Sequence, residues 1–170
     1  MIGQRWIVGL AAVACAGLLA AAGGCAKPPE PPPLPLGADT AIRAGFYKAE
    51  IEDVEIGSQG GARLYEAELT YEGREVEVEV TPDGMIAQIE REVTMAEVPP
   101  AVADAITRAA GDGKIEEIER TEVFAVGQEG QVVPLTPTKV FYEAEFEKGC
   151  REYEVRVAPD GTVLGTESDD

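Results

Sequence analysis

An internal repeat is the feature of this sequence that most constrains its fold. Residues 64–84 align with residues 141–161 at a constant offset of 77, and 12 of the 21 aligned positions are identical. The segment Tyr-Glu-Ala-Glu at 65–68 recurs at 142–145, and Pro-Asp-Gly at 82–84 recurs at 159–161. Upstream of these segments the offset is 64, so the second copy carries 13 additional residues between its first two strands. A chain that repeats itself in this way is expected to build one supersecondary unit twice.

Each copy has the pattern of one helix followed by four strands. In the second copy, Pro99 and Pro100 suit the first helical turn, Val102 and Ile106 fall on one helical face, and the helix is expected to end at Gly111 and Gly113. The first helix, around residues 38–45, is expected to be short. Residues 74–80, Arg-Glu-Val-Glu-Val-Glu-Val, alternate between apolar and acidic side chains, as a strand does when one face is buried and the other is wet.

We therefore predict an α+β fold made of two tandem repeats, each a helix packed on a four-stranded antiparallel sheet. Residues 37–97 form the first repeat and residues 98–170 the second. The pattern leaves open whether the two sheets join edge to edge or form separate lobes.

The repeated segments resemble a known family. The Tyr-Glu-Ala-Glu strand, the Glu-Val-Glu-Val strand, the Pro-Asp-Gly turn and a Pro-led helix ending in Gly-Lys-Ile at 113–115 resemble the PepSY-like repeats of secreted bacterial proteins. That family is similar in fold to the β-lactamase-inhibitor protein, and the resemblance covers residues 36–170. It implies an extracytoplasmic, non-catalytic module with an inhibitory or peptide-binding role, and it supplies no catalytic residues.

The N-terminal segment has the pattern of an export signal. Arg5 precedes an apolar stretch that ends in small residues, and Ala22-Gly23-Gly24-Cys25 resembles a lipobox, with Ala22 where Leu is usual. We predict a lipoprotein signal peptide at 1–24, then lipidated Cys25 and a Pro-rich tether at 25–36. Cleavage after Ala22 to give a soluble chain and an uncleaved transmembrane anchor are the alternatives. The predicted location is the cell envelope, facing the periplasm or the exterior.

The charge of the chain excludes several classes of partner. With 32 acidic and 14 basic residues, the formal net charge is −18. Nucleic acids and anionic bilayers both attract basic proteins, so we expect no nucleic acid partner and membrane attachment through lipid only. A basic protein, a cationic peptide or divalent cations fit this charge, and so does a charge that serves only solubility.

Few residues are suited to catalysis. The sequence contains no His, which removes the Ser-His-Asp and Cys-His mechanisms and the usual zinc and copper sites. Cys150, which aligns with Gly73 at a predicted hairpin tip, is the single Cys of the folded part and is interpreted as an incidental thiol or one that forms an intermolecular disulfide. We predict no enzymatic activity, no cofactor and no metal ligands.

Two regions are candidates for binding. Pairing of the acidic strands would place like charges opposite one another on the wet face of the sheet, which suits a solvated face, a basic partner or a cation. The additional residues of the second copy include apolar Val132, Val133 and Leu135, which we take as candidate partner-binding residues. A hairpin around residues 127–130 that buries its own apolar side chains is the alternative.

The function predicted from the sequence is therefore a non-catalytic cell-envelope lipoprotein whose domain binds a protein or peptide partner, with inhibition of that partner as one form of this function. The alternative is an acidic, cation-binding or purely structural surface lipoprotein.

Overall fold

A computed structural model describes residues 32–168, with two helices and eight strands in those residues. The predicted signal peptide and Cys25 lie outside the described residues. The elements follow in the order α1 (Leu36–Gly45), β1 (Glu50–Gln59), β2 (Ala62–Tyr71), β3 (Arg74–Val80), β4 (Ile86–Glu92), α2 (Pro100–Ala110), β5 (Lys114–Gln128), β6 (Gln131–Lys148), β7 (Arg151–Val157) and β8 (Val163–Ser168).

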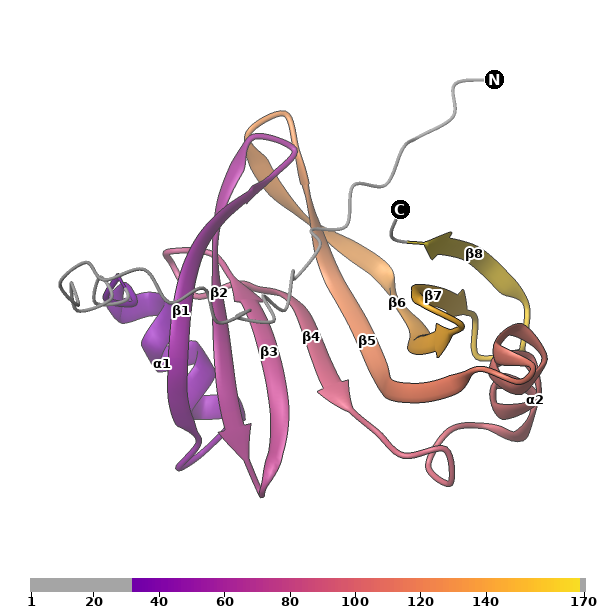
Figure 1. The fold of residues 1–170 in the computed structure, drawn as a ribbon. Coiled ribbons are helices and arrows are strands. Elements are labelled where there is room, and N and C mark those ends of the chain that lie inside the picture. Colours follow the sequence, from indigo (N-terminus) through magenta and orange to yellow (C-terminus); the bar gives the residue numbers. More distant parts are fainter. Residues whose placement is uncertain (1–31, 169–170) are drawn as a thin grey trace, which may run out of the picture.

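All eight strands belong to one antiparallel sheet, in the order β1 to β8 (Figure 1). The predicted fold of two tandem repeats, each a helix packed on a four-stranded antiparallel sheet, is wrong, because the eight strands form one sheet. Strands β4 and β5 pair through residues 88–92 and 119–123 and so join the two copies of the repeat. An unpaired edge strand exposes backbone donors and acceptors, and joining the copies satisfies these groups on both β4 and β5.

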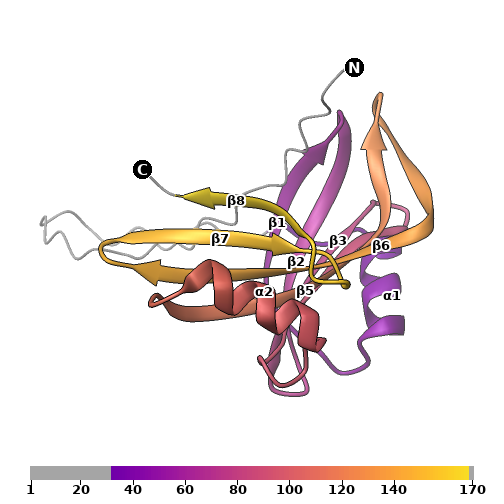
Figure 2. The same cartoon turned by 90° about the vertical axis from the view of Figure 1, so that its right-hand side faces the viewer.

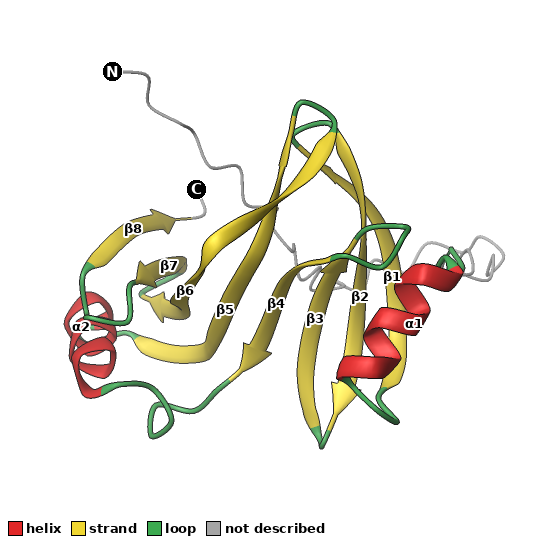
Figure 3. Ribbon diagram, turned by 180° about the vertical axis from the view of Figure 1, so that it is seen from behind, coloured by secondary structure: helices red, strands yellow, loops and turns green. Residues whose placement is uncertain are grey.

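The two helices cover the same face of the sheet, which we call the outer face. Ala38 and Ile42 of α1 are buried against Val78 and other apolar residues of β2 and β3. Helix α2 buries Val102 and Ile106 in a second apolar cluster with residues of β6 and β7. Figure 3 shows α1 lying across β1–β3, with α2 at the far end of the sheet.

Polar residues fill the outer face between the two helices. Arg91 of β4 and Arg120 of β5 both form ion pairs with Glu122, at 2.9 and 2.6 Å. The Arg120 guanidinium, followed by that of Arg91, holds the pKa of the Glu122 carboxyl below its ordinary value. The outer face therefore has two apolar clusters separated by a charged seam at the β4–β5 junction.

The sheet bends strongly, and both helices lie on the outside of the bend (Figures 1 and 2). In Figure 2, β1 and β2 run steeply, while β7 and the part of β6 beside it run almost horizontally. The sheet face inside the bend is covered by neither helix. Strand alternation places on it the acidic side chains that lie between the buried apolar ones.

Candidate functional site

The uncovered side of the sheet, which we call the inner face, carries an array of carboxyl groups. The strand register aligns Glu68, Glu77 and Glu90 in one row across β2, β3 and β4. A second row joins Glu145 and Glu154 across β6 and β7. The inner face is defined by Asp53, Glu55, Glu66, Glu68, Glu77, Glu79, Gln88, Glu90, Glu117, Glu119, Thr121, Glu143, Glu145, Glu154 and Arg156.

Burial and like charge together make ionisation of these carboxyls costly. Glu77 is half-buried, and this burial, followed by the charge of Glu90 directly opposite, raises its pKa from 4.5 to about 9. Burial and then Glu90 likewise raise the pKa of Glu119 to about 8. Burial also raises the pKa of Glu79 and that of Glu90 to about 7. Part of the inner face is therefore protonated near neutral pH.

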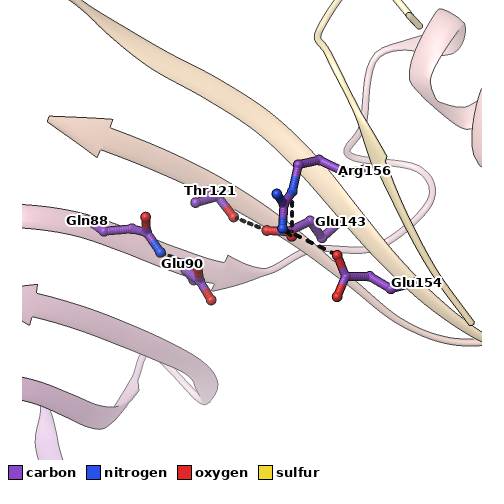
Figure 4. A network of polar contacts seen from close by, with 6 residues as sticks. All are labelled: Gln88, Glu90, Thr121, Glu143, Glu154 and Arg156. Carbon is purple, nitrogen blue, oxygen red and sulfur yellow. Dashed lines mark hydrogen bonds and ion pairs between the residues drawn. The ribbon is translucent and has the colours of Figure 1, made fainter. Parts of the chain in front are cut away.

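A partly buried ion pair lies within this array. Arg156 of β7 donates from Nε to Glu143 Oε1 at 2.7 Å, and its Nη2 also donates to Glu143 and, at 3.4 Å, to Glu154. Thr121 Oγ1 donates to the other oxygen of Glu143 at 3.1 Å. Figure 4 shows these side chains converging from β5, β6 and β7. Because Glu143 is only 8% exposed, the guanidinium and the hydroxyl supply the partners that a buried carboxylate requires.

The equivalent position in the first copy has no such cation. With the offset of 77, Glu66 corresponds to Glu143 and Glu79 corresponds to Arg156. In both copies the two residues are direct cross-strand partners. The first copy therefore places a carboxyl where the second places a guanidinium, and Glu79 Oε2 is buried without a hydrogen-bond partner.

Sequence reasoning missed the pair between Glu143 and Arg156. The alternation in the sequence predicted like charges opposite one another on the wet face, but the two copies were treated as alike. The exchange of Glu79 for Arg156 inside otherwise matching strands was the available signal.

Two hairpin tips meet at one end of the inner face. The Gly127 amide donates to Gln59 Oε1 at 2.5 Å, and the Gly130 amide donates to the Gly60 carbonyl at 2.8 Å. The β1–β2 and β5–β6 hairpins converge in Figure 1. Below the tips, an apolar cluster includes Leu64 and Ala87 together with Ala125 and Val132. The 13 additional residues of the second copy thus build the part of β5–β6 that closes this end of the sheet.

The structure does not bring the three candidate partner-binding residues together in one exposed patch. Val132 is partly buried and packs on the cluster between the hairpins, next to a hollow of about 290 Å³ that Met85 also lines. Val133, the next residue of β6, is 41% exposed and points to the opposite face of the strand. Leu135 is partly buried where β6 leaves its register with β5. A role of these residues in binding stays a prediction.

Other predicted features can be located in the described chain. Cys150 is exposed as a free thiol in the turn between β6 and β7. Within residues 32–168, no group of three or more Cys, Asp or Glu side chains is arranged to hold a metal ion. Neither described helix has the length and hydrophobicity that crossing a bilayer requires.

No model of a known protein family matches this chain, and no curated protein sequence matches it. Solved structures do match. A candidate periplasmic protein from Bacteroides eggerthii has a TM-score of 0.63 at 18% identity, covering 81% of this chain and 90% of its own. A DUF2874 family protein from Bacteroides uniformis has a TM-score of 0.60 at 16% identity, covering 79% of this chain and 88% of its own.

A third similar structure bears on the resemblance seen in the sequence. A BLIP-like protein from Bacteroides fragilis has a TM-score of 0.57 at 18% identity, and the alignment covers 80% of this chain and 86% of that one. This match supports the expected similarity in fold to the β-lactamase-inhibitor protein. Membership of the PepSY-like family stays a prediction. The chain shares its fold with these three bacterial structures.

Proposed function

We propose that this chain is a non-catalytic protein of the cell envelope whose inner face binds a basic segment of a protein or peptide partner. The observation that carries this proposal is the uncovered inner face, where carboxyls from neighbouring strands oppose one another. A folded sheet gains no stability from such an arrangement, because directly opposed like charges are destabilising. A partner with Lys or Arg side chains would convert this repulsion into attraction.

The raised pKa values give this binding a thermodynamic signature. A cation placed against Glu77 or Glu119 favours the ionised carboxyl and so lowers its pKa. Binding therefore releases protons, and the affinity for a basic partner rises as the pH rises towards 9. A surface that bound a neutral partner would lack this dependence.

The location in the envelope rests on two supports. The lipobox-like segment that ends at Cys25 predicts export and lipidation. A protein of similar fold is described as a candidate periplasmic protein. We propose that the mature chain is held at a membrane by its lipid and faces the periplasm or the exterior.

Inhibition of the partner is the finer form of the proposal. It is supported by the fold shared with a BLIP-like protein and by the closed end of the inner face, where the two hairpins meet.

Site-specific photo-cross-linking in the native host tests the proposal. A photoreactive residue replaces exposed Glu145 of the inner face, and cross-links are compared between the otherwise unchanged chain and a chain carrying Glu66→Gln, Glu77→Gln and Glu119→Gln. We expect the triple variant to lose at least about 90% of its cross-linked product, since a tenfold loss of affinity corresponds to only about 1.4 kcal/mol.

The matched control makes three acid-to-amide changes elsewhere, with Glu72→Gln and Glu129→Gln in turns and Asp104→Asn on α2. It should retain the cross-links. Equal cross-linking by the two triple variants would refute binding through the inner face. Replacing Val132, Val133 and Leu135 with Ser tests the hairpin separately, and unchanged cross-linking would remove it from the binding surface.

A further inference from the structure

The internal repeat allows one half of the inner face to be compared with the other, residue by residue. Glu66, Glu77 and Glu79 of the first copy correspond to Glu143, Glu154 and Arg156 of the second. Both sets occupy adjacent strands in the same register, with Glu66 opposite Glu79 and Glu143 opposite Arg156. The two halves therefore present the same backbone frame with different charges.

In the second copy this frame holds a guanidinium. Arg156 contacts Glu143 through both Nε and Nη2, and Nη2 also reaches Glu154. Its Cζ lies 4.9 Å from the centroid of the Phe141 ring. The positions of Glu143 and Glu154 are thus shown, within this chain, to bind an arginine side chain.

In the first copy the same frame has the carboxyls but lacks the cation. Glu79 Oε2 is buried with no hydrogen-bond partner. Burial raises the pKa of Glu66, Glu77 and Glu79, each with a further contribution from neighbouring charges. The other charged groups of the described chain that raise the pKa of Glu66 or Glu77 are themselves carboxyls: Glu55 of β1, Glu68 of β2, Glu90 of β4 and Glu119 of β5.

We propose that Glu66, Glu77 and Glu79 form a recognition site for an arginine side chain of the partner, whose guanidinium contacts these carboxyls as that of Arg156 contacts Glu143 and Glu154 in the other copy. This site rests on the proposed function and identifies the chemistry of the partner. A guanidinium suits it better than an ammonium, because its planar array of donors contacts several carboxylate oxygens at once.

The site is tested with Nα-acetyl-argininamide as the probe. It is titrated at pH 7.5 into the purified protein carrying ¹³C-labelled Glu, and the side-chain carboxyl resonances are followed by NMR. We expect saturable shifts of the Glu66, Glu77 and Glu79 resonances. The citrulline analogue, which is uncharged, should bind at least about tenfold more weakly, because it lacks the charge that assists the hydrogen bonds.

Small, unsaturable shifts spread over the whole inner face would show screening only and overturn the site. A lysine analogue that binds more tightly would overturn the preference for arginine.

Introducing an arginine at the equivalent position of the first copy gives a second test. Glu79→Arg supplies the guanidinium within the chain and should abolish binding of the probe while raising the melting temperature at pH 7.5. Glu129→Arg makes the same change of charge at an exposed hairpin tip and should leave the affinity within about twofold. Unchanged affinity in Glu79→Arg would overturn the site. If Glu79→Arg does not fold, Glu79→Gln replaces it, with a loss of affinity of at least about threefold expected and unchanged affinity again overturning the site.

The outcomes separate this site from the broader proposal. If Glu79→Arg abolishes probe binding but leaves cross-linking to the native partner intact, the partner does not bind through the arginine site. The broader proposal of binding through the inner face then stands. If the inner-face triple Gln variant leaves cross-linking unchanged, the proposed function itself fails.

Discussion

Replacing Glu77 with Gln should stabilise this protein, and the gain should depend on pH. Glu77 lies at the centre of the carboxyl array, where burial and then the charge of Glu90 raise its pKa to about 9 from an ordinary value of 4.5. Between pH 4.5 and 9 the unfolded chain loses this proton while the folded chain keeps it. The folded state then binds more protons, so the free energy of unfolding falls as the pH rises through this range. Gln has the shape of the neutral acid and does not ionise, so Glu77→Gln removes this cost.

The expected magnitude follows from the same pKa values. At pH 7 the interval above 4.5 is about 2.5 pH units, and each unit corresponds to about 1.4 kcal/mol, which gives an upper limit of about 3.5 kcal/mol. Because Glu77 is partly open to solvent, we expect about 2 kcal/mol. For a chain of this size, that gain raises the melting temperature by about 6 °C. At pH 4.5 or below, the gain should be close to zero.

Urea unfolding of the unchanged protein and of Glu77→Gln at pH 4.5 and pH 7.5 measures the effect. Glu72→Gln, in the exposed turn between β2 and β3, is the matched control and should change the free energy of unfolding by less than about 0.5 kcal/mol at either pH. An equal gain at both pH values would show that the effect is not linked to ionisation. No gain at pH 7.5 would show that Glu77 is ionised in the folded protein at little cost, and the reasoning would be refuted.

Three further predictions concern other parts of the chain. Arg156→Gln leaves the buried carboxyl of Glu143 without its cation and should lower the free energy of unfolding by about 3 kcal/mol in urea denaturation, with partial recovery when Glu143→Gln is added. Gly127→Ala places a Cβ against the backbone of the facing hairpin and should lower the melting temperature, whereas Gly57→Ala, with no atom within 4 Å, should change it little. Cys25→Ser should abolish the lipid modification and the membrane association of the mature chain, as measured by intact mass and membrane fractionation; an unmodified, soluble wild-type chain would contradict the predicted anchor.

Local patterns in the sequence located several elements correctly. The alternation in residues 74–80 is confirmed as β3, and the second predicted helix, with Pro99 and Pro100 at its start, is confirmed as α2. Gly111 ends α2 with a positive φ of 62°, a conformation that glycine adopts easily. These features depend on interactions between residues that are close along the chain, so the sequence carries a direct signal for them.

The carboxyl site was predictable only in part. Alternation placed the glutamates of one strand on one face, but the pairing of Glu143 with Arg156 and the missing partner of Glu79 depend on the register between strands. The same holds for the contact between Gly127 and Gln59, which are far apart along the chain and meet through the bend of the sheet. The sequence carries no local signal for contacts between residues that are far apart along the chain.

The sequence by itself therefore determined the duplicated order of elements, the alternation of acidic and apolar side chains and the acidic character of the wet face. The tertiary structure decided that β4 and β5 pair, so that two copies share one bent sheet, and which carboxyls on the inner face have a cation. The physical reason is that local patterns are set by backbone periodicity, which each residue and its near neighbours specify. Edge pairing and cross-strand contacts depend instead on which of several compatible edges and registers bury the most surface and leave the fewest backbone groups unpaired.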